Sequence, residues 1–118
     1  MQFEHEKLPD GVLLLHADGG LDASNADELL DPVETLVDAG FHNIIVDCAR
    51  LEHVSSAALA VLVSLHKRMA KRGGDVKLAA VRTLLAQILE IARLDQVFEI
   101  YPDVEQAHLA FRPKDARA

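Results

Sequence analysis

Residues 43–80 decide the fold of this chain, and they read NIIVDCARLEHVSSAALAVLVSLHKRMAKRGGDVKLAA. Residues 44–46 are β-branched, which is typical of a strand buried on both faces. A helical pattern follows over residues 57–72, and two glycines end it. Residues 76–80 are predicted to form the next strand. This strand–helix–strand order predicts parallel strands joined by a right-handed crossover.

The N-terminal part of the chain adds a hairpin and a helix. Residues 3–7 and 12–17 are predicted strands on either side of a Pro-Asp-Gly turn, and Asp18-Gly19-Gly20 is expected to close the second strand. Helical spacing begins after Ser24, in a stretch that resembles a capping box. Pro32 predicts either a kink or two short helices there.

The C-terminal part continues the alternation. Residues 83–93 are predicted to be a helix, residues 97–101 a strand and residues 102–111 a last helix. Residues 112–118 are expected to be a flexible tail. The inward face of the helix over residues 83–93 is predicted to carry Leu84, Leu85, Ile88 and Ile91.

Together these elements predict an α/β fold, with a mixed, mostly parallel sheet of about five strands and about four helices. The length of 118 residues and an apolar content of 50% suit one compact domain over residues 1–118. Its single cysteine, Cys48, excludes an internal disulfide and is expected to be a buried filler.

Charge and hydropathy exclude several classes of partner. Residues 1–54 carry 12 acidic residues against two basic ones, a formal charge of −10, which argues against nucleic acid. The longest early apolar run, residues 12–15, is far shorter than the ~20 residues that span a bilayer, so no membrane insertion is expected. Acidic residues precede that run where a signal peptide is basic, and the expected location is therefore the cytoplasm.

Two serines stand where a strand and a short loop lead into the long helix. Backbone N–H groups are unpaired at a helix start, so Ser55 or Ser56 could simply cap it. Alternatively, one hydroxyl is a phosphorylation site, since the helix dipole and free amides stabilise a phosphate there. His53 lies close enough to suggest a Ser–His hydrolase, but the Gly-x-Ser-x-Gly elbow is missing.

Three stretches in order resemble the STAS domain family of bacterial anti-sigma factor antagonists. They are residues 19–26, the strand of residues 44–48, and residues 54–62, where Val-Ser-Ser-Ala-Ala-Leu resembles the family's Asp-Ser-Ser-Gly-Leu phosphorylation loop. Aligning Leu59 with the family leucine places the phosphorylated hydroxyl on Ser56. Ser55 then replaces the family aspartate and Ala58 the glycine; a different gap would make Ser55 the acceptor.

The resemblance implies a non-enzymatic switch without metal or cofactor. The dephosphorylated form would bind a GHKL-type anti-sigma factor serine kinase and free its partner, and phosphorylation of Ser56 would release it. A serine phosphatase would reset the switch. The expected partner-binding residues are Asp22, Ser24, Asn25, His53, Ser55, Ala57, Ala58 and Leu59.

One alternative stays open. The same fold could be the STAS subunit of a transporter complex, such as a lipid-transport complex, in which Ser56 only caps the helix. For either function, the loops over residues 18–25 and 53–56 should be neighbours, because strand-to-helix loops of a parallel sheet gather at one edge.

Overall fold

The computed structural model describes residues 4–111. They form one five-stranded sheet in the order β1-β2-β3-β4-β5, so each connection leads to the neighbouring strand. The first two strands pair antiparallel and all other pairs are parallel, as predicted. The elements are β1 (Glu4–Leu8), β2 (Val12–Leu21), α1 (Ala26–Val37), β3 (Asn43–Val54), α2 (Ser56–Ala70), β4 (Asp75–Ala79), α3 (Thr83–Ile91), β5 (Glu99–Tyr101) and α4 (Val104–Ala110), with short 3-10 turns at Pro9–Gly11 and Leu94–Gln96.

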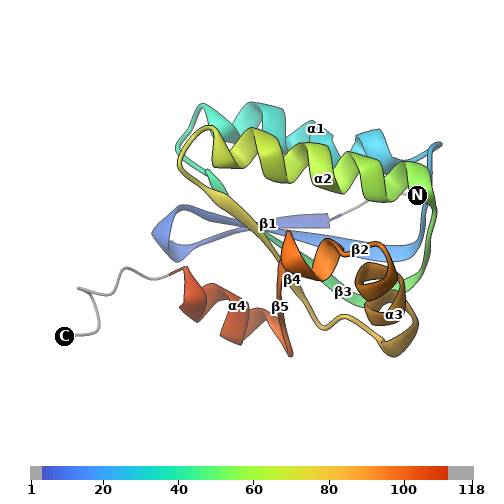
Figure 1. Ribbon diagram of the computed structural model, residues 1–118. Coiled ribbons are helices and arrows are strands. Elements are labelled where there is room, and N and C mark those ends of the chain that lie inside the picture. Colours follow the sequence, from blue (N-terminus) through green and yellow to red (C-terminus); the bar gives the residue numbers. More distant parts are fainter. Residues whose placement is uncertain (1–3, 112–118) are drawn as a thin grey trace.

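The helices cover both faces of the sheet. Helices α1 and α2 lie side by side over one face and α4 lies against the other (Figure 1). The side chains of β2 point alternately to the two faces of the sheet, and each face has its own hydrophobic core. Leu13 and Leu15 join the larger core under α1 and α2, whereas Val12 and Leu14 join the smaller core under α4. This two-sided burial explains why the central strands are continuous apolar runs.

The two longest strands extend further than the sequence predicted. The expected turn at residues 18–20 lies inside β2, which pairs with β3 up to Leu21 and Val54. The pairing register shifts at two places in this segment. Gly19 there has a φ of +78°, which glycine adopts at no steric cost. Gly19 and Gly20, which are typical of a turn, thus form an irregular part of strand β2.

Helix α1 runs unbroken through Pro32. Of the two alternatives predicted at Pro32, a kink or two short helices, the second is therefore wrong. Proline removes one backbone bond, but Leu29, Val33 and Val37 lie on one buried face on either side of it. Burial of that face keeps the helix continuous.

Helix α3 differs from its predicted orientation. Leu85 and Leu89 are buried, but Leu84 is 61% exposed and Ile91 83% exposed. Apolar residues on more than one side of this short helix made the inward face ambiguous in the sequence. The predicted tail over residues 112–118 lies outside the described residues. Within residues 4–111, no helix is long and apolar enough to cross a membrane.

Candidate functional site

The loop between β2 and α1 is built around Asp22. Its Oδ1 accepts hydrogen bonds from the backbone N–H of Ser24 (2.8 Å) and from the Ser24 hydroxyl (2.6 Å). These bonds hold the pKa of the Asp22 carboxyl below its ordinary value, so it is ionised at neutral pH. Asp22 therefore shapes its own loop and also carries a negative charge at its surface.

Asn25 completes this loop and corrects the predicted cap. Its Oδ1 accepts from the backbone N–H of Asp22 (2.9 Å), and its Nδ2 donates to the carbonyl of Gly20 (2.8 Å). The N-cap of α1 is Asn25, without a side-chain cap bond. The predicted capping box is wrong because the Ser24 hydroxyl bonds backwards to Asp22.

The two serines before α2 have separate places. Ser55 is the N-cap: its Oγ accepts a 3.1 Å hydrogen bond from the backbone N–H of Ala58. Ser56 is the first residue of the helix, and it is exposed. The capping function and the exposed hydroxyl are thus divided between neighbouring residues.

The structure brings the two predicted loops together. Leu21 pairs with Val54, and the backbone N–H of Ser55 donates to the carbonyl of Leu21 (2.9 Å). Upstream on the same strands, Gly20 pairs with His53, whose imidazole occupies the space that a side chain at Gly20 would need. The expectation that both loops share one edge of the sheet is confirmed.

The other predicted contact residues differ in accessibility. Ala57 is exposed, whereas Ala58 is fully buried and Leu59 packs partly buried against the core. Ala58 therefore offers no side-chain surface to a partner, and its methyl group faces the inside of the protein.

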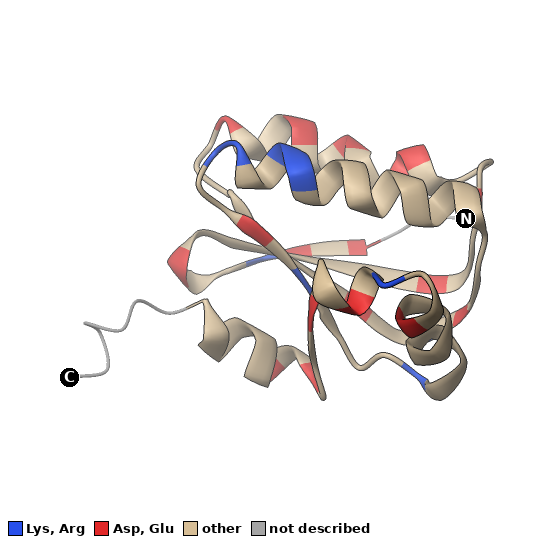
Figure 2. Ribbon diagram, in the orientation of Figure 1, with Lys and Arg blue, Asp and Glu red and all other residues tan. Residues whose placement is uncertain are grey.

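The charge around this edge is uneven. Acidic residues are spread along α1, and the basic residues of α2 gather toward its C-terminal end (Figure 2). Lys67 and Arg68 occupy the last turn of α2, where the helix dipole favours cations. The start of α2, from Ser56 to His66, carries no Asp, Glu, Lys or Arg.

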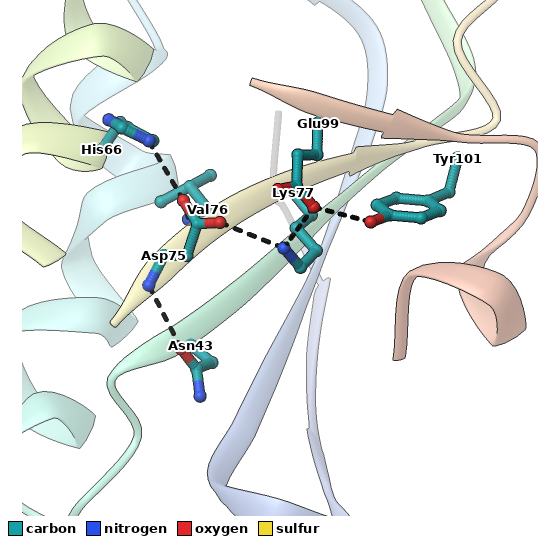
Figure 3. A network of polar contacts seen from close by, with 7 residues as sticks. All are labelled: Asn43, His66, Asp75, Val76, Lys77, Glu99 and Tyr101. Carbon is teal, nitrogen blue, oxygen red and sulfur yellow. Dashed lines mark hydrogen bonds and ion pairs between the residues drawn. The ribbon is translucent and has the colours of Figure 1, made fainter. Parts of the chain in front are cut away.

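A second polar group, which the sequence pattern did not predict, lies where β4 begins. Lys77, 5% exposed, donates to Glu99 Oε1 (2.7 Å) and Asp75 Oδ2 (3.0 Å) (Figure 3). Tyr101 donates to the same Glu99 oxygen (2.6 Å), and His66 Nε2 lies 3.0 Å from Asp75 Oδ1. These contacts tie α2, β4 and β5 together.

The pKa shifts of Lys77 and Glu99 fit a structural role for this cluster. Burial would lower the pKa of Lys77, but its hydrogen bonds to Glu99 and Asp75 outweigh burial and raise it. The same bond to Lys77 lowers the pKa of Glu99. Lys77 is thus a paired cation rather than a nucleophile. Charge-matched partners are what permit its burial.

Cys48 is buried, and burial raises the pKa of its thiol to about 12. This agrees with the prediction of an apolar filler, since the thiolate is the reactive form of cysteine.

Comparisons with known proteins identify the family of this chain. Residues 6–107 match the STAS domain. The chain is 27% identical over 103 residues to BtrV of Bordetella bronchiseptica, provisionally named an anti-sigma factor antagonist, covering 87% of this chain and 89% of BtrV.

Two solved structures share the fold. One is from Thermotoga maritima and is provisionally described as an anti-sigma factor antagonist; it has a TM-score of 0.85 at 23% identity and covers 94% of this chain and 95% of that one. The Bacillus anti-sigma factor antagonist SpoIIAA in its phosphorylated form has a TM-score of 0.75 at 15% identity, covering 93% and 99%. The family match spans most of the sequence and the fold agrees with these structures: the chain belongs to the STAS domain family.

Proposed function

We propose that this protein is an anti-sigma factor antagonist that works by partner switching. The dephosphorylated form binds an anti-sigma factor of the GHKL serine kinase type and frees the sigma factor. The kinase phosphorylates Ser56, the complex dissociates, and a serine phosphatase restores the binding form. The general role is supported by relatives named as anti-sigma factor antagonists.

One observation carries the choice of Ser56. Its hydroxyl is exposed at the first position of α2, while the neighbouring Ser55 hydroxyl is engaged with the Ala58 N–H. A kinase can therefore modify Ser56 without removing the helix cap. The amides at the helix start and its dipole stabilise the resulting phosphate.

The same position explains release. A phosphoserine adds about −1.5 to −2 charges at neutral pH. The Asp22 loop, which carries an ionised carboxylate, lies next to the Ser56 loop. Covering this face after phosphorylation would remove water from a dianion beside a like charge, which opposes association.

Phosphopeptide mapping tests the acceptor. The probe is the GHKL-type kinase whose gene lies nearest to the gene for this chain, supplied with ATP. We expect one phosphate on Ser56, lost in Ser56→Ala and kept in Ser55→Ala. Phosphorylation that persists in Ser56→Ala would show that Ser56 is not the phosphate acceptor.

A binding titration tests the switch. Ser56→Ala should bind the kinase like the wild type, and Ser56→Asp should bind at least about tenfold more weakly, because it adds a charge at the contact face. Ser64→Asp is the matched control: it adds the same charge to an exposed position of α2, about 12 Å further along the helix at ~1.5 Å per residue. Equal affinities for all these forms would refute the switch and favour the transporter subunit.

A further inference from the structure

Helix α4 is short and depends on its contacts with the sheet. It spans seven residues, and helices below about 12–15 residues are marginal in water on their own. The structure describes all seven, and Ala107 is the buried one among them. Asp103 caps the first turn by accepting a hydrogen bond from the backbone N–H of Gln106 (2.8 Å). Packing against the sheet must supply the rest of its stability.

The core under α4 is separate from the core on the other face of the sheet. Its buried members are Val12, Leu14, Ile45 and Ala79 from the sheet and Ala107 from α4. Among the described residues, the larger core under α1 and α2 takes no side chain from α4. Lifting α4 would therefore uncover the smaller core and leave the larger one intact. Such regions open locally at a lower free energy than the whole fold.

A charged side chain lies on the face of the sheet that α4 covers. Lys77 pairs with the buried Ile45 across the strands, and 5% of Lys77 is exposed. Its Nζ lies 4.5 Å from the centroid of the ring of Phe111, the C-cap of α4, and 5.8 Å from that of Tyr101. A cation over an aromatic ring is attracted to it, more strongly where water is excluded. The ammonium therefore holds the end of the helix.

The partners of Lys77 prepare this contact. Glu99 Oε1 (2.7 Å) and Asp75 Oδ2 (3.0 Å) accept hydrogen bonds from its Nζ (Figure 3), and they belong to β5 and β4. These carboxylates fix the ammonium on the sheet whether or not α4 is in place. Phe111 thus docks onto a charge that is already positioned.

The two ends of α4 are attached in different ways. In its last turn, His108 Nε2 donates to the carbonyl oxygen of Pro9 (2.9 Å), in the turn between β1 and β2. At its start, Pro102 and Asp103 alone separate it from Tyr101, the last residue of β5. The chain itself therefore holds the start of α4, whereas side-chain contacts hold its end.

We propose that α4 is a hinged strap, which swings away from the sheet at Pro102-Asp103 while the rest of the fold stays closed. The contact between Lys77 and Phe111 is the latch that keeps it down. Opening uncovers the smaller core to solvent. A lysine rather than an apolar residue stands under α4 because a paired, buried charge fixes where the helix docks. The strap does not depend on the proposed function.

Native-state hydrogen exchange in urea tests the strap. After correction for intrinsic rates, amides of α4 should exchange at least about tenfold faster than those at the centre of β3. Their exchange should depend weakly on urea, because a local opening exposes little surface. Phe111→Leu keeps an apolar side chain but removes the ring, and it should speed exchange in α4 by about tenfold. Equal rates and equal urea dependence in α4 and β3 would overturn the proposal.

Phe41→Leu is the matched control. Phe41 also lies near a lysine, with its ring centroid 6.0 Å from Lys7 Nζ, but it packs against the larger core. This change should speed exchange at the centre of β3, which requires global unfolding. It should leave exchange in α4 unchanged, because opening of the strap keeps the contacts of Phe41. Faster exchange in α4 would show that the helix opens only with the whole fold.

Lys77→Met tests the latch. It should speed exchange in α4, as Phe111→Leu does. The double variant should gain less than the product of the two single effects, because both changes remove the same contact. Effects that multiply fully would show that the two side chains act separately, and Lys77 would then not be the latch.

Discussion

The backbone N–H of Ser55 donates a 2.9 Å hydrogen bond to the carbonyl oxygen of Leu21. It extends the pairing of β2 with β3 by one step beyond Leu21 and Val54. One backbone bond thus joins the loop that carries Ser56 to the loop that carries Asp22. Because neither residue's side chain forms the bond, substitutions at Ser55 or Ser56 test capping and switching without breaking this connection.

The division between the two serines predicts unequal effects on stability. Ser55→Ala removes the bond to the Ala58 N–H and should lower the free energy of unfolding by about 0.5–2 kcal/mol, as for other N-caps. Ser56→Ala, at an exposed position inside the first turn, should change it by less than about 0.5 kcal/mol. Urea denaturation of both variants measures this. The reverse order would mean that Ser56 is the cap.

Two glycines should respond differently to alanine. A Cβ at Gly74 would collide with the backbone carbonyl of His42, and backbone cannot rotate away. Gly74→Ala should therefore lower the free energy of unfolding by about 1–3 kcal/mol or more, as overpacking does. The nearest atoms to a Cβ at Gly20 all belong to the exposed His53 ring, which can swing outward. Gly20→Ala should cost less, and adding His53→Ala should recover part of the loss. Equal losses at both glycines in thermal unfolding would contradict this.

The Lys77–Glu99 pair predicts a pH-dependent contribution to stability. The bond to Lys77 holds the pKa of Glu99 below its ordinary value of 4.5 in the folded protein. The pair therefore stabilises the fold above about pH 4.5 and loses this effect as the pH falls through the folded pKa. Glu99→Gln should be less stable than wild type at pH 7, by no more than about 1 kcal/mol because the Glu99 side chain is 60% exposed. The gap should shrink at pH 3.5. A gap that widens on acidification would show that the pair does not stabilise the fold.

Cys48 should be unreactive until the protein unfolds. Its thiol is buried, and its pKa of about 12 leaves about one molecule in ten thousand as thiolate at pH 8. Iodoacetamide should label it only in urea. Labelling of the native protein at the rate of a free cysteine would contradict the buried position.

The sequence alone determined the order of the elements and the position of the loop that carries Ser55 and Ser56. Alternation of β-branched strands with amphipathic helices favours parallel strands, because a helix that joins two neighbouring strands can cover the face of the sheet that they form. The order of its loops along the chain then places Asp22 and Ser56 at one edge. The element order follows from short-range sequence patterns. The shared edge follows from the topology that this order favours.

Tertiary structure decided what the local pattern leaves open. Pro32 stays inside α1 because a buried face outweighs one lost bond, and the glycines after His16 continue a strand because β3 pairs with them. Ser55 rather than Ser56 caps α2 because the ladder to Leu21 sets where the helix begins. The outward face of Leu84 and the pairing of Lys77 with Glu99 depend on residues distant in the sequence, whose contacts exist only after folding.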